Sequence, residues 1–445
     1  MRAELASGAA PPFQSQALAG VLLLAMTLLA VARLVIPGLP AALAGVLAWL
    51  AMLLLLPRLQ RASLLQAGAL LAVGLACAGW AAGQGVEPDW AGFLDANLGL
   101  LALLAGVSFL RLVTLPVAGA EEALPRGIHA LWRTLLGTHL FAAVINLSAL
   151  LITGDRLAER GRLSRPTTVL LTRAFTTAAF WSPFFAAMGV ALTYAPGASL
   201  GALVAQGLPL AVLALLYTLW EVRRLCGAKV ASQPGYPIHF GALWIPAALV
   251  AGVLLVHRLW PAMSVILVVS GLALSLTVLV SLWRAPGQAY SRLRRHTLDE
   301  LPRMAGELTL FLAAGALSAG LNSLFQALGT DLPMIEINVP ALVGLLAAMV
   351  LLAVIGVHPV ISIAAVGTWL APLHADPNLL GTLFLCVWAI GVTLSPLSGV
   401  SLALIGRYAL SARQILRWHG RYALVMWLAA SLALWLAAGI HGPGG

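Results

Sequence analysis

Residues 392–401, VTLSPLSGVS, place a Ser-Pro step and two further serines inside a long apolar run. A proline inside a helix removes one backbone hydrogen bond and clashes with the preceding turn, so backbone polar groups are freed. Residues 180–189, FWSPFFAAMG, place a second Ser-Pro step inside another apolar run. In a bilayer the freed groups need partners, which bound ions and solutes can supply. The two stretches predict broken membrane helices at 167–193 and 378–405; an ordinary proline kink is the alternative for each.

The composition identifies the class of protein. Of the 445 residues, 61% are hydrophobic and only 9% are charged, far more apolar sequence than a soluble core needs. Several apolar runs reach the roughly 20 residues that span a bilayer, which predicts an all-α polytopic membrane protein. The formal charge of +10 is spread over short segments between these runs, where basic residues set orientation and contact anionic lipid head groups. We therefore expect membrane lipids and no nucleic acid as partners. The short polar stretch up to Gln16 has no signal-peptide pattern, so we expect no removable signal sequence.

Eleven apolar runs predict membrane-spanning helices. They lie near 17–36, 38–56, 62–83, 93–110, 167–193, 206–221, 240–257, 262–283, 305–329, 378–405 and 421–440. By the positive-inside rule, the arginine-rich segments between them face the cytoplasm. These are 57–61, 154–166, 222–236, 284–303 and 406–421, whereas the acidic segments 84–95, 330–338 and 372–377 face outward. The amino terminus is then cytoplasmic and the carboxyl terminus external, in the cell's inner membrane.

Two further apolar stretches do not fit a single crossing. Residues 130–153 begin and end beside cytoplasmic segments, and residues 340–371 begin and end beside external ones. Each is predicted to be a re-entrant hairpin, which is allowed only where protein or water satisfies the turning backbone. The first hairpin is expected to turn at Gly137-Thr138-His139 or at Asn146-Leu147-Ser148. The second is expected to turn at Gly356-Val357-His358-Pro359, because proline disfavours helix at the residue before it.

The order of these features occurs twice. A Gly-x-His triplet, at 137–139 and again at 356–358, precedes a Ser-Pro step by about forty residues. The first copy is flanked by arginines and the second by acids, which predicts two inverted repeats of the kind found in secondary transporters. The predicted divisions are a first segment and span at 1–37, repeats at 38–221 and 240–440, a cytoplasmic linker at 222–239 and an external tail at 441–445.

Polar side chains within the hairpins and broken helices are the predicted substrate and ion ligands. They are Thr138, His139, Asn146, Ser148, Ser182, Pro183, His358, Ser362, Thr393, Ser395, Ser398 and Ser401. Hydroxyls and freed carbonyls can hold sodium, whereas the lack of acids among them argues against a carboxylate proton relay. If protons are the coupling ion, His139 and His358 are the candidates. The alternative is that each histidine only caps its turn.

Arg173 is the one basic residue well inside a predicted crossing. An arginine in a membrane helix is costly, which makes Arg173 a possible partner for an anion; snorkelling to the cytoplasmic face is the alternative. Helix dipoles at the breaks would also favour an anionic substrate. The isolated cysteines Cys77, Cys226 and Cys386 show no metal-ligand spacing, and no nucleotide-binding motif is present. We expect no metal and no cofactor beyond the coupling ion, Na⁺ or H⁺.

Residues 395–404, SPLSGVSLAL, continuing to Arg413-Gln414, resemble the closing segment of citrate–metal and related carboxylate transporters. The layout over roughly residues 40–440 resembles the ion transporter superfamily, which includes the divalent anion–sodium symporters and the membrane subunits of tripartite dicarboxylate transporters. The resemblance implies a homodimer in which hairpins and broken helices move like an elevator. The chain lacks the Ser-Asn-Thr signature of the divalent anion symporters at its hairpins, so neither citrate nor succinate is carried over as substrate.

The expected function is secondary active transport of a small organic anion rather than enzymatic catalysis. A membrane enzyme acting on lipid-linked substrates is one alternative, which the short external loops disfavour. A non-transporting membrane subunit that binds partners through the basic segment 284–303 is the other.

Overall fold

The computed structural model describes residues 13–36, 38–114, 123–237, 240–329, 337–373 and 375–440. Regular structure in these ranges is helical. Ten helical segments of the described chain are long and apolar enough to cross a membrane, and three apolar helices are shorter. The chain is thus a multi-pass helical membrane protein, as predicted. The ten include one segment that was not predicted as a span, Ile128–Ile145, and lack two that were. The predicted span 167–193 is broken, and the helix in the predicted span 240–257, Trp244–Leu259, has only 16 residues.

The chain divides into two compact units, and each unit draws on both halves of the sequence. Unit 1 comprises Met1–Val113 and Gly252–Leu332, and unit 2 comprises Thr114–Ala251 and Pro333–Gly445. Helix α12 (Trp244–Leu259) contributes residues to both. All four elements that the sequence predicts to be interrupted belong to unit 2. This division does not test the predicted repeats, and the predicted tail at 441–445 lies outside the described residues.

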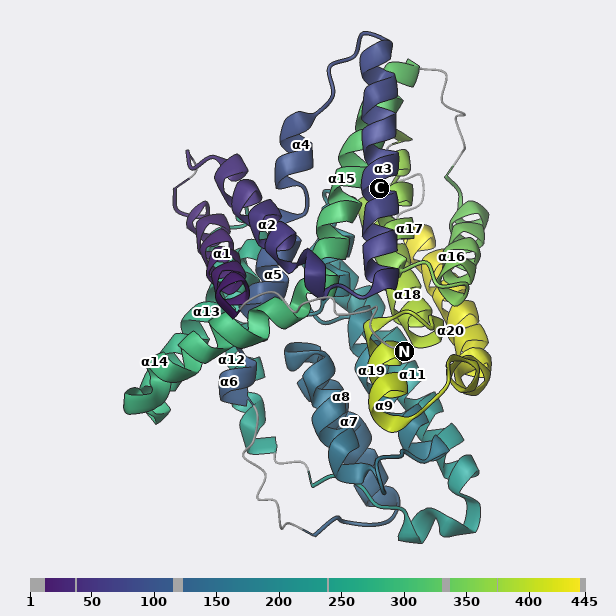
Figure 1. The fold of residues 1–445 in the computed structure, drawn as a ribbon. Coiled ribbons are helices and arrows are strands. Elements are labelled where there is room, and N and C mark those ends of the chain that lie inside the picture. Colours follow the sequence, from purple (N-terminus) through teal and green to yellow (C-terminus); the bar gives the residue numbers. More distant parts are fainter. Residues whose placement is uncertain are drawn as a thin grey trace, which may run out of the picture. The chain divides into compact units, whose positions relative to one another are not determined.

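Unit 1 contains nine α-helices besides its share of α12 (Figure 1). They are α1 (Phe13–Ala32), α2 (Ala41–Leu55), α3 (Arg61–Gly83), α4 (Trp90–Asp95), α5 (Leu98–Ser108), α6 (Arg111–Thr114), α13 (Val265–Arg284), α14 (Pro286–Arg295) and α15 (Ala305–Leu328). Helices α3 and α15 lie side by side. A Cβ atom on Gly74 would lie 2.7 Å from the Ala316 carbonyl oxygen, and one on Gly320 would lie 2.1 Å from that of Gly74. Glycine therefore lets the two backbones touch, as is common between membrane helices.

Two regions of unit 1 show detail beyond the sequence prediction, although the predicted span 93–110 falls within a segment of membrane length, Trp90–Thr114. The predicted span 93–110 is interrupted at Asn97, which adopts a φ of 61° between α4 and α5. The Asn97 Nδ2 atom donates to the Phe311 carbonyl oxygen of α15 at 2.8 Å. The predicted basic segment 284–303 is largely helical, through α14, a π-helical turn (His296–Glu300) and a 3₁₀ turn (Leu301–Met304). Pro286 occupies the first turn of α14, where a missing N–H costs nothing.

The described part of unit 2 contains ten further α-helices. They are α7 (Ile128–Ile145), α8 (Leu147–Leu157), α9 (Arg165–Thr176), α10 (Ala186–Tyr194), α11 (Leu200–Cys226), α16 (Val339–Val354), α17 (Pro359–Leu370), α18 (Pro377–Leu394), α19 (Gly399–Tyr408) and α20 (Ala412–Ile440), with a 3₁₀ turn η2 (Thr177–Phe180) after α9 and the start of α12. Helix α18 is the centre of this unit, because every side chain from Leu380 to Leu394 is buried. Helix α11 extends to Cys226, five residues into the predicted linker 222–239.

Candidate functional site

The first pair of helices, α7 and α8, is called hairpin 1 here (residues 128–157). The helices contact each other and are joined at Asn146, whose backbone adopts φ 52° and ψ −136°. Its N–H donates to the Ala142 carbonyl oxygen at 3.0 Å. Of the two predicted turn positions, the one at Asn146 is therefore right, because asparagine tolerates a positive φ. Gly137-Thr138-His139 lies buried inside α7, so the prediction of a turn there is wrong.

The second pair, α16 and α17, is called hairpin 2 (residues 339–370). Its chain turns at the predicted residues, between Val354 and Pro359. Gly356 has a φ of 103°, which glycine adopts readily, and Pro359 begins α17. The N–H of Val360 donates to His358 Nδ1 at 3.2 Å, so His358 caps α17. The two Gly-x-His triplets are thus not equivalent in structure. That either hairpin re-enters the membrane remains a prediction.

The first broken helix is interrupted at its predicted Ser-Pro step. Between η2 and α10 the chain leaves helical geometry at residues 181–185, called break 1. The fully buried Ser182 hydroxyl donates to the Ala143 carbonyl oxygen near the end of α7 and accepts the Phe184 N–H at 3.2 Å. Break 1 is therefore fastened to hairpin 1, close to its turn at Asn146.

The second broken helix is interrupted between α18 and α19, at residues 395–398, called break 2. Ser398 caps α19 by accepting the Ser401 N–H at 3.3 Å, and its hydroxyl lies 3.0 Å from that of Ser401. The Ser395 hydroxyl is fully buried and has no hydrogen-bond partner within the described residues. An unsatisfied buried hydroxyl costs about 1–3 kcal/mol, which marks Ser395 as a ligand candidate.

Contacts join the two breaks and the two hairpin turns into one cluster. Ser182 bonds break 1 to hairpin 1, and the Thr393 hydroxyl, just before break 2, lies 2.8 Å from that of Thr176 at the end of α9. A Cβ atom on Gly356, in the turn of hairpin 2, would lie 3.2 Å from Leu397 Cδ1 in break 2. We call this cluster the interruption cluster.

The remaining predicted ligands take different positions. Asn146 and Ser148 are half-buried at the turn of hairpin 1. Thr138 Oγ1 lies 3.4 Å from Thr153 Oγ1 within the same hairpin. The Ser362 hydroxyl donates to the Pro359 carbonyl oxygen at 3.0 Å, inside the first turn of α17. Thr138 and Ser362 therefore bond within their own hairpins.

His139 bonds through both ring nitrogens. Its Nδ1 lies 3.0 Å from the Ala174 carbonyl oxygen, and its Nε2 accepts the Trp181 indole N–H at 3.1 Å. This pattern requires a neutral ring with the proton on Nδ1. His358 Nδ1 likewise accepts a backbone N–H, so this nitrogen carries no proton. His358 caps its turn, as in the alternative prediction, whereas His139 lies inside α7 and caps no turn.

Arg173 is paired inside unit 2. Its side chain is 0% exposed, with Nη1 2.7 Å from Glu221 Oε2, Nε 3.2 Å from His419 Nδ1 and Nη2 3.1 Å from the Trp418 carbonyl oxygen. The guanidinium also lies 4.3 Å from the centre of the Tyr422 ring. Snorkelling is therefore wrong, since the side chain does not reach solvent. Because Glu221 balances its charge, we place Arg173 outside the interruption cluster, as a tie from α9 to α11 and α20.

Three residues of this region were missed by sequence reasoning as site residues. The buried Thr172 hydroxyl has no hydrogen-bond partner within the described chain, and Thr176 lies one turn later on the same face of α9. Trp181 holds His139. The spacing of threonines at 168, 172 and 176 was the available signal, because residues four apart share a helix face.

Helix α8 is also tied to α19, at its far end from the turn. Arg407 pairs with both carboxylate oxygens of Asp155, with Nε 2.6 Å from Oδ1. The Tyr408 hydroxyl donates to the same Asp155 Oδ1 at 2.9 Å. Hairpin 1 is thus connected to the second broken helix as well as to the first.

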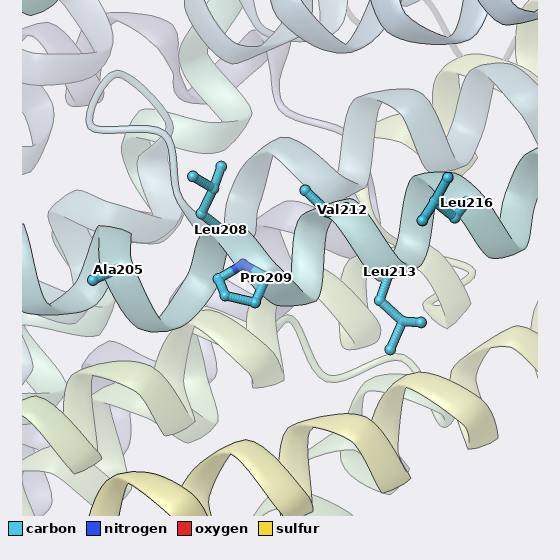
Figure 2. A pocket seen from close by; sticks show the side chains of 6 residues that line it. All are labelled: Ala205, Leu208, Pro209, Val212, Leu213 and Leu216. Carbon is cyan, nitrogen blue, oxygen red and sulfur yellow. The ribbon is translucent and has the colours of Figure 1, made fainter. Parts of the chain in front are cut away.

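A separate, apolar pocket lies on α11 (Figure 2). It is lined by Ala205, Leu208, Pro209, Val212, Leu213 and Leu216, of which the four leucine and valine side chains are largely exposed. Exposed aliphatic side chains on a membrane-length helix are suited to contact with lipid tails. This pocket has no polar lining residue and is distinct from the interruption cluster.

Within the described residues, no group of three or more His, Cys, Asp or Glu side chains could hold a metal ion. The atoms of the interruption cluster that could bind a cation are hydroxyl oxygens and backbone carbonyl oxygens.

Comparison with known proteins finds similarity in structure rather than in sequence. No protein-family model matches the chain, and no curated protein matches it. The structure is similar to the crystal structure of the Alcanivorax borkumensis YdaH transporter, which is described as having an unusual topology. The TM-score is 0.48 at 16% sequence identity, over 84% of this chain and 85% of that chain. A similarity of this degree assigns neither a family nor a substrate.

Proposed function

We propose that this protein is a secondary active transporter that moves a small organic anion across the cell's inner membrane, coupled to Na⁺ or H⁺. The observation that supports this most is the interruption cluster, where two helix breaks and two hairpin turns meet around buried hydroxyls. Irregular backbone at membrane depth is tolerated where it is buried in protein or lines a cavity, and transporters place substrate and ion sites there.

The first of the proposed anion ligands lies in break 2. The Ser395 hydroxyl is free to donate, and the nearby helix α19 begins at the serine-capped residues 398–401. Helix starts carry partial positive charge, so a carboxylate beside break 2 would gain both a hydroxyl donor and backbone N–H groups. Ser182 and Pro183 at break 1, Asn146 and Ser148 at the turn of hairpin 1, and His358 at hairpin 2 complete the proposed site.

The coupling ion is proposed to be Na⁺ rather than H⁺. The hydroxyls of Thr176 and Thr393 are 2.8 Å apart and both buried, and broken helices expose carbonyl oxygens nearby. His139 uses both of its ring nitrogens, so protonating it would remove the bond from Trp181. Sodium needs no such change.

The division of the chain supports an elevator-type mechanism. All residues of the interruption cluster belong to unit 2, and none belongs to unit 1. The proposed site could therefore move with unit 2 while unit 1 stays in place. We propose that unit 2 moves, that unit 1 mediates the homodimer, and that the amino terminus is cytoplasmic and the carboxyl terminus external.

A thermal-shift screen of the purified protein tests this proposal. Carboxylates, sulfonates and inorganic oxyanions are each added with sodium or with choline, because a ligand that binds only the folded state raises the Tm. We expect a carboxylate to raise the Tm only with sodium present, and Ser395→Ala to lose that rise.

Ser431→Ala is the matched control, because the Ser431 hydroxyl bonds to the Trp427 carbonyl oxygen of its own helix, α20, and is not in the interruption cluster. It should retain the full response. Absence of a rise with every anion, or an unchanged response in Ser395→Ala, would contradict the proposal. A rise that ignores sodium would support the anion site and replace Na⁺ with H⁺.

A further inference from the structure

Helix α14 lies in the chain between two helices of membrane length, α13 and α15. It follows α13, which ends at Arg284, and precedes α15, which begins at Ala305, and both neighbours are part of membrane-length segments. Figure 1 shows α14 running across the direction of α3 and α15 within unit 1. A short helix at the end of one span and before the next must therefore lie near the lipid head groups.

The side chains of α14 suit that position. Ala289 is its one buried residue, and the sequence PGQAYSRLRR carries three arginines and no acid. Arg292, Arg294 and Arg295 are exposed. Tyr290 is 78% exposed, and Trp283, in the last turn of α13, is 75% exposed. Tyrosine and tryptophan are enriched at the membrane–water interface, where the ring and the polar group meet different surroundings.

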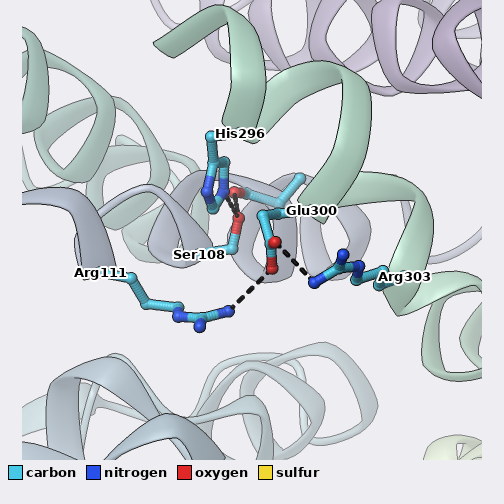
Figure 3. Close-up of polar contacts among 6 residues, drawn as sticks. Ser108, Arg111, His296, Glu300 and Arg303 are labelled. Carbon is cyan, nitrogen blue, oxygen red and sulfur yellow. Dashed lines mark hydrogen bonds and ion pairs between the residues drawn. The ribbon is translucent and has the colours of Figure 1, made fainter. Parts of the chain in front are cut away.

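The acids that follow α14 do not cancel its charge. Figure 3 shows that the Glu300 carboxylate is taken by two other arginines, Arg111 at 3.3 Å and Arg303 at 2.7 Å. His296, one turn earlier, bonds instead to Ser108, with 2.8 Å between Nε2 and Oγ. Asp299 is the one other acid between residues 284 and 303, against five arginines. The segment therefore keeps a net positive charge at the surface.

We propose that α14 binds the head groups of anionic phospholipids, with Arg292, Arg294 and Arg295 contacting lipid phosphates and Trp283 and Tyr290 lying at head-group depth. The guanidinium group matches phosphate geometry through paired N–H donors, which an ammonium cannot do. Basic residues next to a membrane are attracted to anionic lipid, and each adds to the affinity. Because the flanking spans keep α14 at the surface, lipid phosphates are the anions within reach.

The test compares phosphatidylglycerol with phosphatidylcholine of the same acyl chains, added to the purified protein in a neutral detergent. We expect phosphatidylglycerol to raise the Tm by several degrees more than phosphatidylcholine. The triple variant Arg292→Gln, Arg294→Gln, Arg295→Gln should lose most of that difference and keep the wild-type Tm in phosphatidylcholine. The triple variant with lysine at the same positions should keep part of it.

The matched control removes three exposed arginines elsewhere, through Arg413→Gln, Arg417→Gln and Arg421→Gln on α20. It should keep the phosphatidylglycerol response; an equal loss would show a general charge effect and overturn the proposal.

Glycerol 3-phosphate should leave the Tm unchanged, and a rise equal to that of the lipid would assign a soluble phosphate instead. If the glutamine triple variant does not fold, the test is made on the wild type, by measuring the difference in Tm between the two lipids at low and at high salt. The lipid difference should vanish at high ionic strength, and its persistence would overturn the proposal.

Discussion

Hairpin 1 and hairpin 2 are held by different forces. In hairpin 1, His139 bonds to Ala174 and Trp181, and the Ala143 carbonyl oxygen accepts from Ser182, all across to the first broken helix. In hairpin 2, His358 and Ser362 bond within the first turn of α17. Its contact with α18 includes close packing, because a Cβ atom on Gly391 would lie 3.1 Å from Ala353 Cβ and Pro359 Cγ, and the His358 ring lies edge-on to Trp388 with 5.3 Å between centroids.

The difference indicates which hairpin moves more easily. Directional hydrogen bonds to buried partners fix one arrangement, and separating them leaves polar groups unpaired. Packing through small residues is short-ranged but has no fixed direction, so one surface can slide over the other at lower cost. We therefore expect hairpin 2 to open more readily than hairpin 1.

The largest expected effect comes from His139→Ala, which removes two hydrogen bonds between hairpin 1 and the first broken helix. It leaves the Ala174 carbonyl oxygen and the Trp181 N–H without that partner, at about 1–3 kcal/mol each in the free energy of unfolding. Denaturation in mixed micelles measures the loss. A loss below about 1 kcal/mol would show that these bonds do not hold hairpin 1.

Gly391→Val tests the packing of hairpin 2. The added side chain would meet Ala353 and Pro359, and overpacking of this kind costs about 1–3 kcal/mol. We expect faster hydrogen exchange across α16 and α17, with α7 and α8 unchanged, measured by mass spectrometry. Gly344→Val, at a position where a Cβ atom would meet nothing within 4 Å, is the control for valine in a helix. Equal exchange in both variants would contradict the expectation.

His358→Ala should cost less than His139→Ala, because it removes one capping hydrogen bond and one edge-on ring contact with Trp388. Loss of a capping side chain costs about 0.5–2 kcal/mol. His358→Asn should restore most of the stability, since asparagine is a good cap. If His358→Ala destabilised the protein as much as His139→Ala, the proposed difference between the hairpins would be lost.

Asp155→Asn should have the smallest effect. The side chains of Asp155 and Arg407 are 43% and 55% exposed, and exposed ion pairs contribute about 0–1 kcal/mol. A double-mutant cycle with Arg407→Gln isolates the pair. A coupling energy above about 2 kcal/mol would move the main attachment of hairpin 1 from His139 to this pair.

The sequence could predict the interruptions that have a local cause. Pro183, Pro396 and the Gly356–Pro359 turn restrict the backbone wherever they occur, and all three interruptions lie where predicted. The break at Asn97 has no proline beside it, and Gly137–His139 contains nothing that stops a helix. The charge pattern of the basic segment around α14 does not predict its helix, although Pro286 marks the helix start.

The candidate site was less predictable because its contacts join distant parts of the chain. The serines of both Ser-Pro steps could be named, but not that Ser182 is bonded while Ser395 is left without a partner. The sequence predicts an anion partner or a snorkelling residue at Arg173, since its true partner Glu221 lies 48 residues away in sequence. Pairings at that distance are fixed by tertiary packing, which no local pattern encodes.

The pairing of Arg173 also has a consequence for how the protein is made. Synthesis runs from the amino terminus, so Arg173 is made 48 residues before Glu221 and 246 residues before His419. An unpaired arginine at the centre of a helix opposes insertion by about 2.5–3.5 kcal/mol. We therefore expect α9 to wait beside the insertion machinery until α11 arrives, and the two to enter the bilayer together. A nascent chain that stops before residue 221 should leave α9 accessible to water.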